Sequence, residues 1–249
     1  MMTNPAARWI AIWMLGLAAL AAPHPSAAAP QPAGGETLRP VFSRLLGGPP
    51  VLRINAVPGP RDGAYNQIGV YAEHAAIQGL HIDQLWFRLV GADLDAAQLR
   101  RGTLQVRKVQ SSAIYGKVSR ASVQDLLNHE KTVTDVTLTA DGATTVATGT
   151  IAYGGVPTRV TMRGTFQVSG VPEIFFHLDA LTVDALPMPG AVAAQVEQQI
   201  NPVVDLRNWP VSFAIRMFRQ TSAGFILSSQ PDDAQPCEAC VGAPVQPTP

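Results

Sequence analysis

Apolar and polar residues alternate along much of the chain, and the most regular run extends from Val156 to Val168. In this run Val160, Met162 and Phe166 would face one side of a strand, and Arg and Thr side chains would face the other. Gly164 interrupts the apolar row, which indicates strong bending or the close approach of another backbone at that point. The run therefore predicts one long strand with a buried face.

Shorter runs of the same period predict strands before and after it. Their ranges are 51–57, 68–77, 80–90, 103–115, 132–139, 145–153, 173–186 and 211–218. The last of them would place Phe213, Ile215 and Met217 on one buried face. About seven to nine strands joined by tight turns, with only two or three helices, predict an α+β fold. In that fold a strongly curved antiparallel sheet would wrap around one or two helices.

The run 80–90 contains one aromatic side chain on the unexpected face. Trp86 points away from the main apolar set, which includes Leu85 and Phe87. It is either covered by another element or an exposed aromatic residue. Large aromatic side chains are highly buried on average, so we expect a cover over Trp86.

Two segments have the period of a helix. In 119–130, Val123, Leu126 and Leu127 form an apolar stripe, and Ser119 or Ser122 can cap the first turn. A shorter helical turn is expected over 38–46, where it is stopped by two glycines and two prolines.

The second clear helix is predicted over 191–200. Val192, Val196 and Ile200 recur at every fourth residue, with glutamines on the other sides. The helix would therefore share one apolar layer with the strands that flank it. That layer is either an ordinary closed core or a partly open one that holds a lipid.

The two ends of the chain differ in composition from its middle. Residues 1–28 have the form of a secretory signal peptide, with Arg8, an apolar run stopped by Pro23 and small residues before the expected cleavage after Ala28; a retained anchor is the alternative. A spacer rich in Pro, Gly and Ala follows over 29–49, and the folded domain is expected over 50–229. We expect the mature protein to be soluble and periplasmic or otherwise extracytoplasmic.

The segment 230–249 is rich in Pro and has no periodicity, so it is predicted to be disordered. Cys237 and Cys240 are the chain's two cysteines. They lack the helix N-terminus that lowers a thiol pKa in redox motifs, and two thiolates fall short of a structural zinc site. We expect a small local disulfide between them, or an intermolecular one.

The charge balance and the missing motifs argue against several classes of function. Charged residues make up 14% of the chain and balance to a net charge of zero, so a nucleic-acid partner is not expected. The spacings typical of serine hydrolases, zinc proteases and phosphate-binding loops are missing from the sequence. His177 and Asp179 share a strand face but lack a third ligand. We therefore predict no catalytic residue, no metal and no cofactor.

Three stretches resemble the LmeA-like phospholipid-binding proteins of the bacterial envelope. One is the helical segment 119–128, and another is Leu186-Pro187 followed by a helix that ends in Ile200-Asn201-Pro202. The third is a final strand pair about Gly224, and the resemblance covers roughly residues 51–229. These are moderately specific patterns of apolar residues, and the Pro-rich tail with two cysteines departs from the family.

The resemblance implies a fold similar to tubular lipid-binding domains, in which a curved sheet encloses a helix-lined apolar groove. The implied partners are a phospholipid and, transiently, a membrane surface, while the sequence does not indicate a protein partner. The lining would comprise Val160, Met162, Phe166, Val192, Val196, Ile200, Phe213, Ile215 and Met217. The expected function is to shelter acyl chains in envelope lipid transport or maintenance. The alternatives are an enzyme or accessory factor of envelope glycan or lipid metabolism, with His177 and Asp179 as its candidates, and a non-catalytic scaffold with a closed core.

Overall fold

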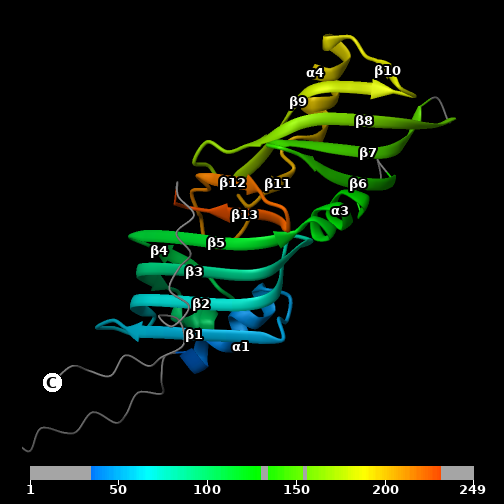
Figure 1. Ribbon diagram of the computed structural model, residues 1–249. Coiled ribbons are helices and arrows are strands. Elements are labelled where there is room, and N and C mark those ends of the chain that lie inside the picture. Colours follow the sequence, from blue (N-terminus) through cyan, green and yellow to red (C-terminus); the bar gives the residue numbers. More distant parts are fainter. Residues whose placement is uncertain (1–34, 130–133, 154–155, 231–249) are drawn as a thin grey trace, which may run out of the picture. The chain divides into compact units, whose positions relative to one another are not determined.

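The computed structural model describes residues 35–129, 134–153 and 156–230. These residues form an α+β fold with two antiparallel sheets and four helices, which confirms the predicted fold class and strand direction (Figure 1). The predicted single, strongly curved sheet does not form, because the strands divide between two sheets and neither is strongly curled. Alternation predicts that a segment is a strand, but it does not indicate which strand will be its neighbour.

The first sheet, here called sheet A, joins the beginning and the end of the described chain. Its order is β1-β2-β3-β5-β13-β12, with β4 paired to the end of β3. The strands are β1 Val51–Pro58, β2 Ala64–Ile77, β3 Leu80–Leu94, β4 Val106–Lys108, β5 Ser111–Ser119, β12 Met217–Gln220 and β13 Gly224–Ser228. The predicted strand 103–115 is thus divided between β4 and β5.

One face of sheet A is packed against helix α1, Gly35–Leu45, which extends the short helical turn expected here. Leu38, Val41 and Phe42 are buried, and the Phe42 ring lies 5.4 Å from that of Phe87 on β3. The short helix α2, Ala96–Arg100, follows β3 and is capped by the Asp95 side chain. The main hydrophobic core therefore lies on the Phe87 face of sheet A.

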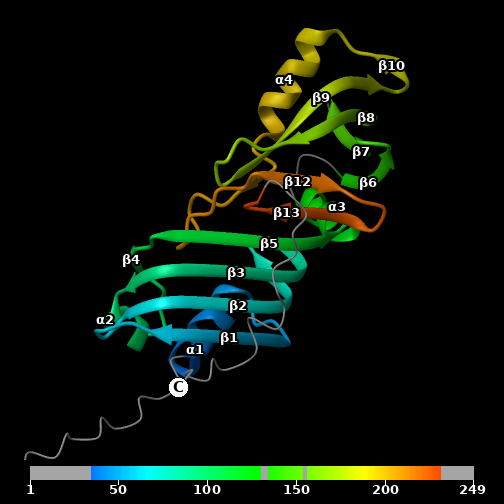
Figure 2. The ribbon, with the colours of Figure 1, turned by 60° about the vertical axis from the view of Figure 1, so that its left-hand side comes forward.

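The second sheet, sheet B, is built from the middle of the chain in the order β10-β9-β8-β7-β6. The strands are β6 Thr134–Asp141, β7 Thr144–Tyr153, β8 Val156–Gln167, β9 Glu173–Val183, β10 Leu186–Pro187 and β11 Val204–Asp205, which also pairs with β9. Helix α3, Arg120–His129, lies against β6, and helix α4, Gly190–Ile200, lies against β9 (Figure 2). The predicted helices 119–130 and 191–200 are both confirmed.

The predicted strand 211–218 is wrong in its first part. Val211, Phe213 and Ile215 are buried, as the alternation indicated, but the segment carries no regular ladder before Met217. It is an extended stretch held by single bonds, such as that from the Gly170 amide to the Ile215 carbonyl, 2.9 Å. Burial of alternate side chains was therefore predicted correctly, while strand pairing was not.

Candidate functional site

The candidate site is the apolar layer between helix α4 and strands β8 and β9 of sheet B. The buried side chains Phe176, Leu178 and Leu181 of β9 form its floor. The half-buried residues packed on them are Met162, Phe166, Met188, Val192, Ala193, Val196, Ile200 and Val203. No residue of α4 is buried, so its apolar stripe is only partly withdrawn from solvent.

Helix α4 is fixed to the edge of β9 by two polar side chains. Glu197 Oε2 accepts a hydrogen bond from the Leu178 amide, 3.1 Å. Asn201 Oδ1 accepts from the Phe176 amide, 2.7 Å, and its Nδ2 donates to the Phe176 carbonyl, 2.9 Å. Four residues of a helix rise about 6 Å, and two residues of a strand extend about 6.6 Å. The spacing of the two acceptor side chains therefore matches the spacing of the two β9 amides that they bind.

Helix α3 is joined to β6, at the opposite edge of sheet B, in the same way. Gln124 Oε1 accepts from the Leu138 amide, 2.9 Å, and Asn128 Oδ1 from the Val136 amide, 2.8 Å. β6, and the part of β9 between its short partners β10 and β11, therefore both have edge amides satisfied by helix side chains four residues apart. An edge covered in this way is protected from pairing with another strand.

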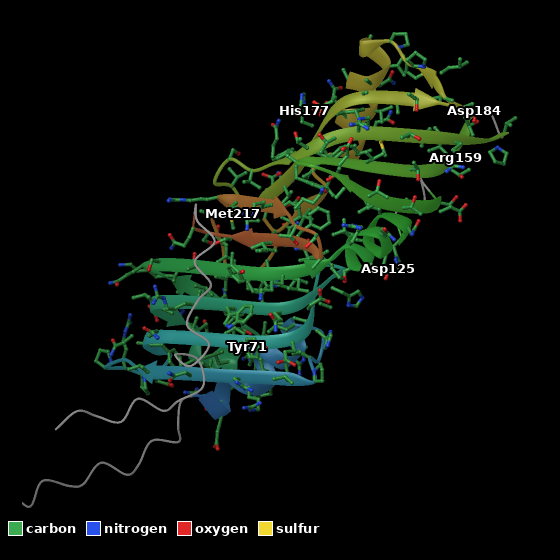
Figure 3. The ribbon with its side chains drawn as sticks, viewed as in Figure 1. Tyr71, Asp125, Arg159, His177, Asp184 and Met217 are labelled. Carbon is green, nitrogen blue, oxygen red and sulfur yellow. The ribbon has the colours of Figure 1, made fainter. Side chains whose placement is uncertain are left out.

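Of the nine predicted lining residues, five lie together in this layer and a sixth, Val160, is buried on β8. The five are Met162, Phe166, Val192, Val196 and Ile200. Phe213 and Ile215 lie elsewhere, in the main core with Phe87, and the Phe87 and Phe213 rings are 5.9 Å apart. Met217 is half-buried on β12, opposite Ser228 of sheet A (Figure 3).

One end of the layer is closed by aromatic rings. Phe166 lies 5.1 Å from Phe176, 5.0 Å from Phe218 and 5.3 Å from Phe225, measured between ring centroids. The predicted contact from the last segment was Met217, but Phe218 makes it instead. The alternation changes phase after Ile215, which the sequence pattern did not reveal.

The other end of the layer is open to solvent. Leu186 pairs with Val183, which pairs with Val160, so all three continue the apolar face of sheet B. Leu186 is 69% exposed, and Val156, at the start of β8, is 63% exposed. The apolar face thus passes from an aromatic cluster at Phe166 to exposed aliphatic side chains about ten residues away along β8.

Gly164 is in the tightest part of this face. A Cβ added there would lie 2.0 Å from the His177 carbonyl oxygen and 2.7 Å from Cζ of Phe176. The pairing of β8 with β9 shifts by one residue between Arg163 and Gly164. The predicted close approach of another backbone at this glycine is therefore confirmed.

The candidate acid–base residues His177 and Asp179 lie on the edge of β9 and are about half exposed. His177 Nδ1 is 3.2 Å from Glu197 Oε1, whereas its Nε2 is 3.9 Å from Asp179 Oδ1. The bond from the Leu178 amide, and then His177, lower the pKa of Glu197. Glu197 was not expected in this group, because its position on the polar side of the helix indicated a solvated residue.

Among the described residues there is no group of three His, Cys, Asp or Glu side chains that could hold a metal ion. Within the same part of the chain, none of the helices has the length and apolar character needed to cross a membrane. An open depression beside α4 is lined by Ala194, Glu197, Gln198 and Asn201. The expected signal peptide 1–28 and the pair Cys237 and Cys240 lie outside the described residues.

Comparison with known proteins adds no assignment. No family model, curated protein or solved structure matches the chain.

Proposed function

We propose that this protein is an exported lipid-binding protein that shelters phospholipid acyl chains in the apolar layer beneath α4, in envelope lipid transport or maintenance. The observation that supports this most directly is an amphipathic helix whose apolar stripe stays half-exposed over a buried apolar floor. A helix that only completed a core would bury this stripe. The resemblance to LmeA-like proteins and the expected export signal agree with this function.

The two ends of the layer also differ in a way that suits an acyl chain. Its aromatic end at Phe166 and Phe176 is closed, and its opposite end at Leu186 and Val156 is open. A chain that enters at the open end meets Val160 and Met162 of β8, and the hydroxyl of Thr158 in the same row is hydrogen-bonded to the Val156 carbonyl. Each methylene removed from water contributes about 0.8 kcal/mol, so partial insertion of one chain already gives useful affinity.

The attachment of α4 indicates which part of the helix would move. Glu197 and Asn201, in the C-terminal half of the helix, bond the β9 backbone. The first turn has no side-chain cap, and the chain just before it is held to β9 by the Met188 amide, which donates to the Leu181 carbonyl, 2.9 Å. Between these two attachments α4 contacts the floor through apolar side chains alone, so an acyl chain would enter by displacing the contacts of Val192, Ala193 and Val196.

Native mass spectrometry of the mature protein, purified without detergent and then incubated with phosphatidylglycerol or phosphatidylethanolamine vesicles, tests this function. The expected result is a one-to-one complex with a diacyl phospholipid that survives removal of the vesicles. A protein that stays free of lipid and inert supports the scaffold with a closed core. Free protein that modifies the lipid or a glycan supports the envelope enzyme, with His177, Asp179 and Glu197 as the residues to replace.

A further inference from the structure

The closed end of the apolar layer lies level with the end of helix α4. Asn201, directly after the helix, binds the amide and the carbonyl of Phe176. Just before the helix, the Met188 amide donates to the Leu181 carbonyl, 2.9 Å. Helix α4 therefore covers the floor of the layer from Leu181 to Phe176, alongside β9 (Figure 2).

This covered floor has a definite length. Helix α4 has 11 residues and rises about 16 Å, and the stretch of β9 from Leu181 to Phe176 extends by about the same length. The acyl chains of one bilayer leaflet fill about 15 Å, half of a hydrocarbon core that is about 30 Å thick. The floor beneath α4 is therefore about as long as the acyl chains of one leaflet are deep.

Four phenylalanines stand at the closed end of this floor, and we call them the phenylalanine stop. They are Phe166, Phe176, Phe218 and Phe225. The Phe166 ring is at the centre and meets the other three at interplanar angles of 63°, 69° and 80°. Such edge-to-face packing is an arrangement that aromatic pairs prefer, so the Phe166 ring is held on three sides.

The phenylalanine stop is anchored in both sheets. Its rings come from β8 and β9 of sheet B and from β12 and β13 of sheet A. Beside Phe218 on β12, Gln220 Oε1 accepts a hydrogen bond from the Thr145 hydroxyl of β7. The Phe176 ring also lies against Gly164, where a Cβ would be 2.7 Å from its Cζ and 2.8 Å from its Cε1. An acyl chain therefore has no free path between this ring and the backbone of β8.

The side chains between the open end and the stop are of a different kind. Val192 and Val196 of α4 rest on the floor and are only half-buried, and so are Met162 and Met188. Methionine is unbranched and adapts its conformation to irregular spaces. An acyl chain can therefore displace these contacts, whereas it meets a fixed ring at Phe176.

We propose that the phenylalanine stop sets the length of the acyl chain that the layer beneath α4 accepts. The Phe176 ring is the surface that the end of the chain meets, and Phe166 holds this ring in position. This inference rests on the proposed lipid-binding function and adds a specificity to it. A chain that fills one leaflet is sheltered completely, while the last methylenes of a longer chain stay in water.

Monoacyl phosphatidylglycerols that differ only in chain length provide the test, because each molecule brings a single chain. Dissociation constants are measured below the critical micelle concentration for the lauroyl, myristoyl, palmitoyl, stearoyl and arachidoyl members of the series. They should fall about fourfold for each methylene that enters the layer. Near the palmitoyl chain, whose bilayers have leaflets of about 15 Å, they should level off.

Replacement of Phe176 by Ala should move this levelling point to longer chains. The lost ring opens about 5 Å, the usual separation of two packed rings, so the stearoyl and arachidoyl chains should bind more tightly than the palmitoyl chain. Asn201 binds only the backbone of residue 176, so α4 stays attached. If Phe176→Ala does not fold, Phe176→Leu should show a smaller shift in the same direction.

Leu181→Ala, at the opposite end of the floor, is the matched control. It should weaken the binding of every chain by a similar factor and leave the levelling point in place. An unchanged levelling point in the Phe176 variants would overturn the inference, as would a parent whose affinity still rises at the arachidoyl chain. Either result leaves the proposed function intact, because the chains still bind. If no chain of any length binds to the parent, the proposed function fails and the inference fails with it.

Discussion

Asn201 binds both backbone polar groups of Phe176, accepting from its amide at 2.7 Å and donating to its carbonyl at 2.9 Å. A side-chain amide has one acceptor and one donor end, so it can replace the two hydrogen bonds of a missing neighbouring strand. This residue joins the end of α4 to the edge of β9. Asn201 therefore attaches the C-terminal end of the helix, while Glu197, one turn earlier, makes the second polar contact with β9.

Replacement of Asn201 by Ala should destabilise the protein. It leaves the amide and the carbonyl of Phe176 without these partners, at a cost of about 1–3 kcal/mol for a buried polar group. Urea unfolding of Asn201→Ala measures the loss. Asn201→Asp retains the acceptor alone and should fall between Ala and the parent, whereas Gln198→Ala, exposed on the same helix, should have almost no effect. Equal stability of Asn201→Ala and Gln198→Ala would contradict the role given to Asn201.

Acid should weaken the attachment of α4 through Glu197. Its pKa is lowered in the fold, first by the Leu178 amide and then by His177. A carboxylate of this kind stabilises the fold above its unfolded pKa, about 4.3, and the contribution is lost as the pH falls through the lower folded pKa. Unfolding free energies of the parent and of Glu197→Gln, measured between pH 5 and pH 3, should converge toward the acid end. Parallel curves would mean that the charge on Glu197 does not hold the helix.

Gly164 should not tolerate a methyl group. Alanine at this position would place its Cβ 2.0 Å from the His177 carbonyl oxygen, so the β8 and β9 backbones would have to separate. We expect a loss of about 1–3 kcal/mol or more, measured by thermal or urea unfolding. Gly190→Ala is the matched control, since a Cβ there meets nothing within 4 Å. A neutral Gly164→Ala would show that this contact is looser than the structure indicates.

A substitution at Val196 distinguishes a layer that admits acyl chains from a closed core. It is half-buried at the middle of the α4 stripe, above Phe176 and Leu178. If acyl chains enter beneath α4, the indole of Val196→Trp should occupy their space and abolish phospholipid binding, while the lipid-free stability changes by less than about 1 kcal/mol. Gln198→Trp on the polar side should change neither property. Strong destabilisation of Val196→Trp, or unchanged lipid binding, would favour the closed scaffold.

The exposed end of sheet B should be the part that contacts membranes. Val156 and Leu186 are 63% and 69% exposed, so a charge at either position costs the fold little. Val156→Asp with Leu186→Asp should reduce phospholipid uptake from vesicles and leave the melting temperature unchanged, because a buried charge opposes insertion into lipid. Ser111→Asp, exposed on sheet A, is the control. Uptake that resists the double substitution would place the entry site elsewhere.

Periodicity predicted the elements well because burial of one face leaves a direct trace in the sequence. The stripe at Val192 and Val196 and the row at Val160 and Met162 were both identified in this way, and both lie in sheet B or on its helix. The aromatic contact of Phe218 was not predicted. The segment before β12 is not paired as a strand, so the side chains that face the core need not continue to alternate after Ile215.

The division into two sheets and the helix attachments were not predictable by the same reasoning. Pairing of β5 with β13 depends on contacts between distant residues, which alternation does not encode. Gln124, Asn128 and Glu197 look like ordinary polar positions of a surface helix, and only the position of an edge strand gives them a specific role. Asn201 and Asn128 likewise look ordinary in the sequence, and their contacts with the β9 and β6 backbones follow only from the structure.

Sheet A is completed by the last strand that the structure describes. Strand β13 inserts between β5 and β12, and Phe225 pairs with Val118, while the whole of sheet B lies between these two residues along the chain. During synthesis from the N-terminus, β5 therefore keeps an open edge until residues 224–228 emerge. The hairpins of sheet B have partners close by in sequence and can form earlier. The interval before β13 arrives is the period in which this chain is most vulnerable to pairing with a strand of another molecule.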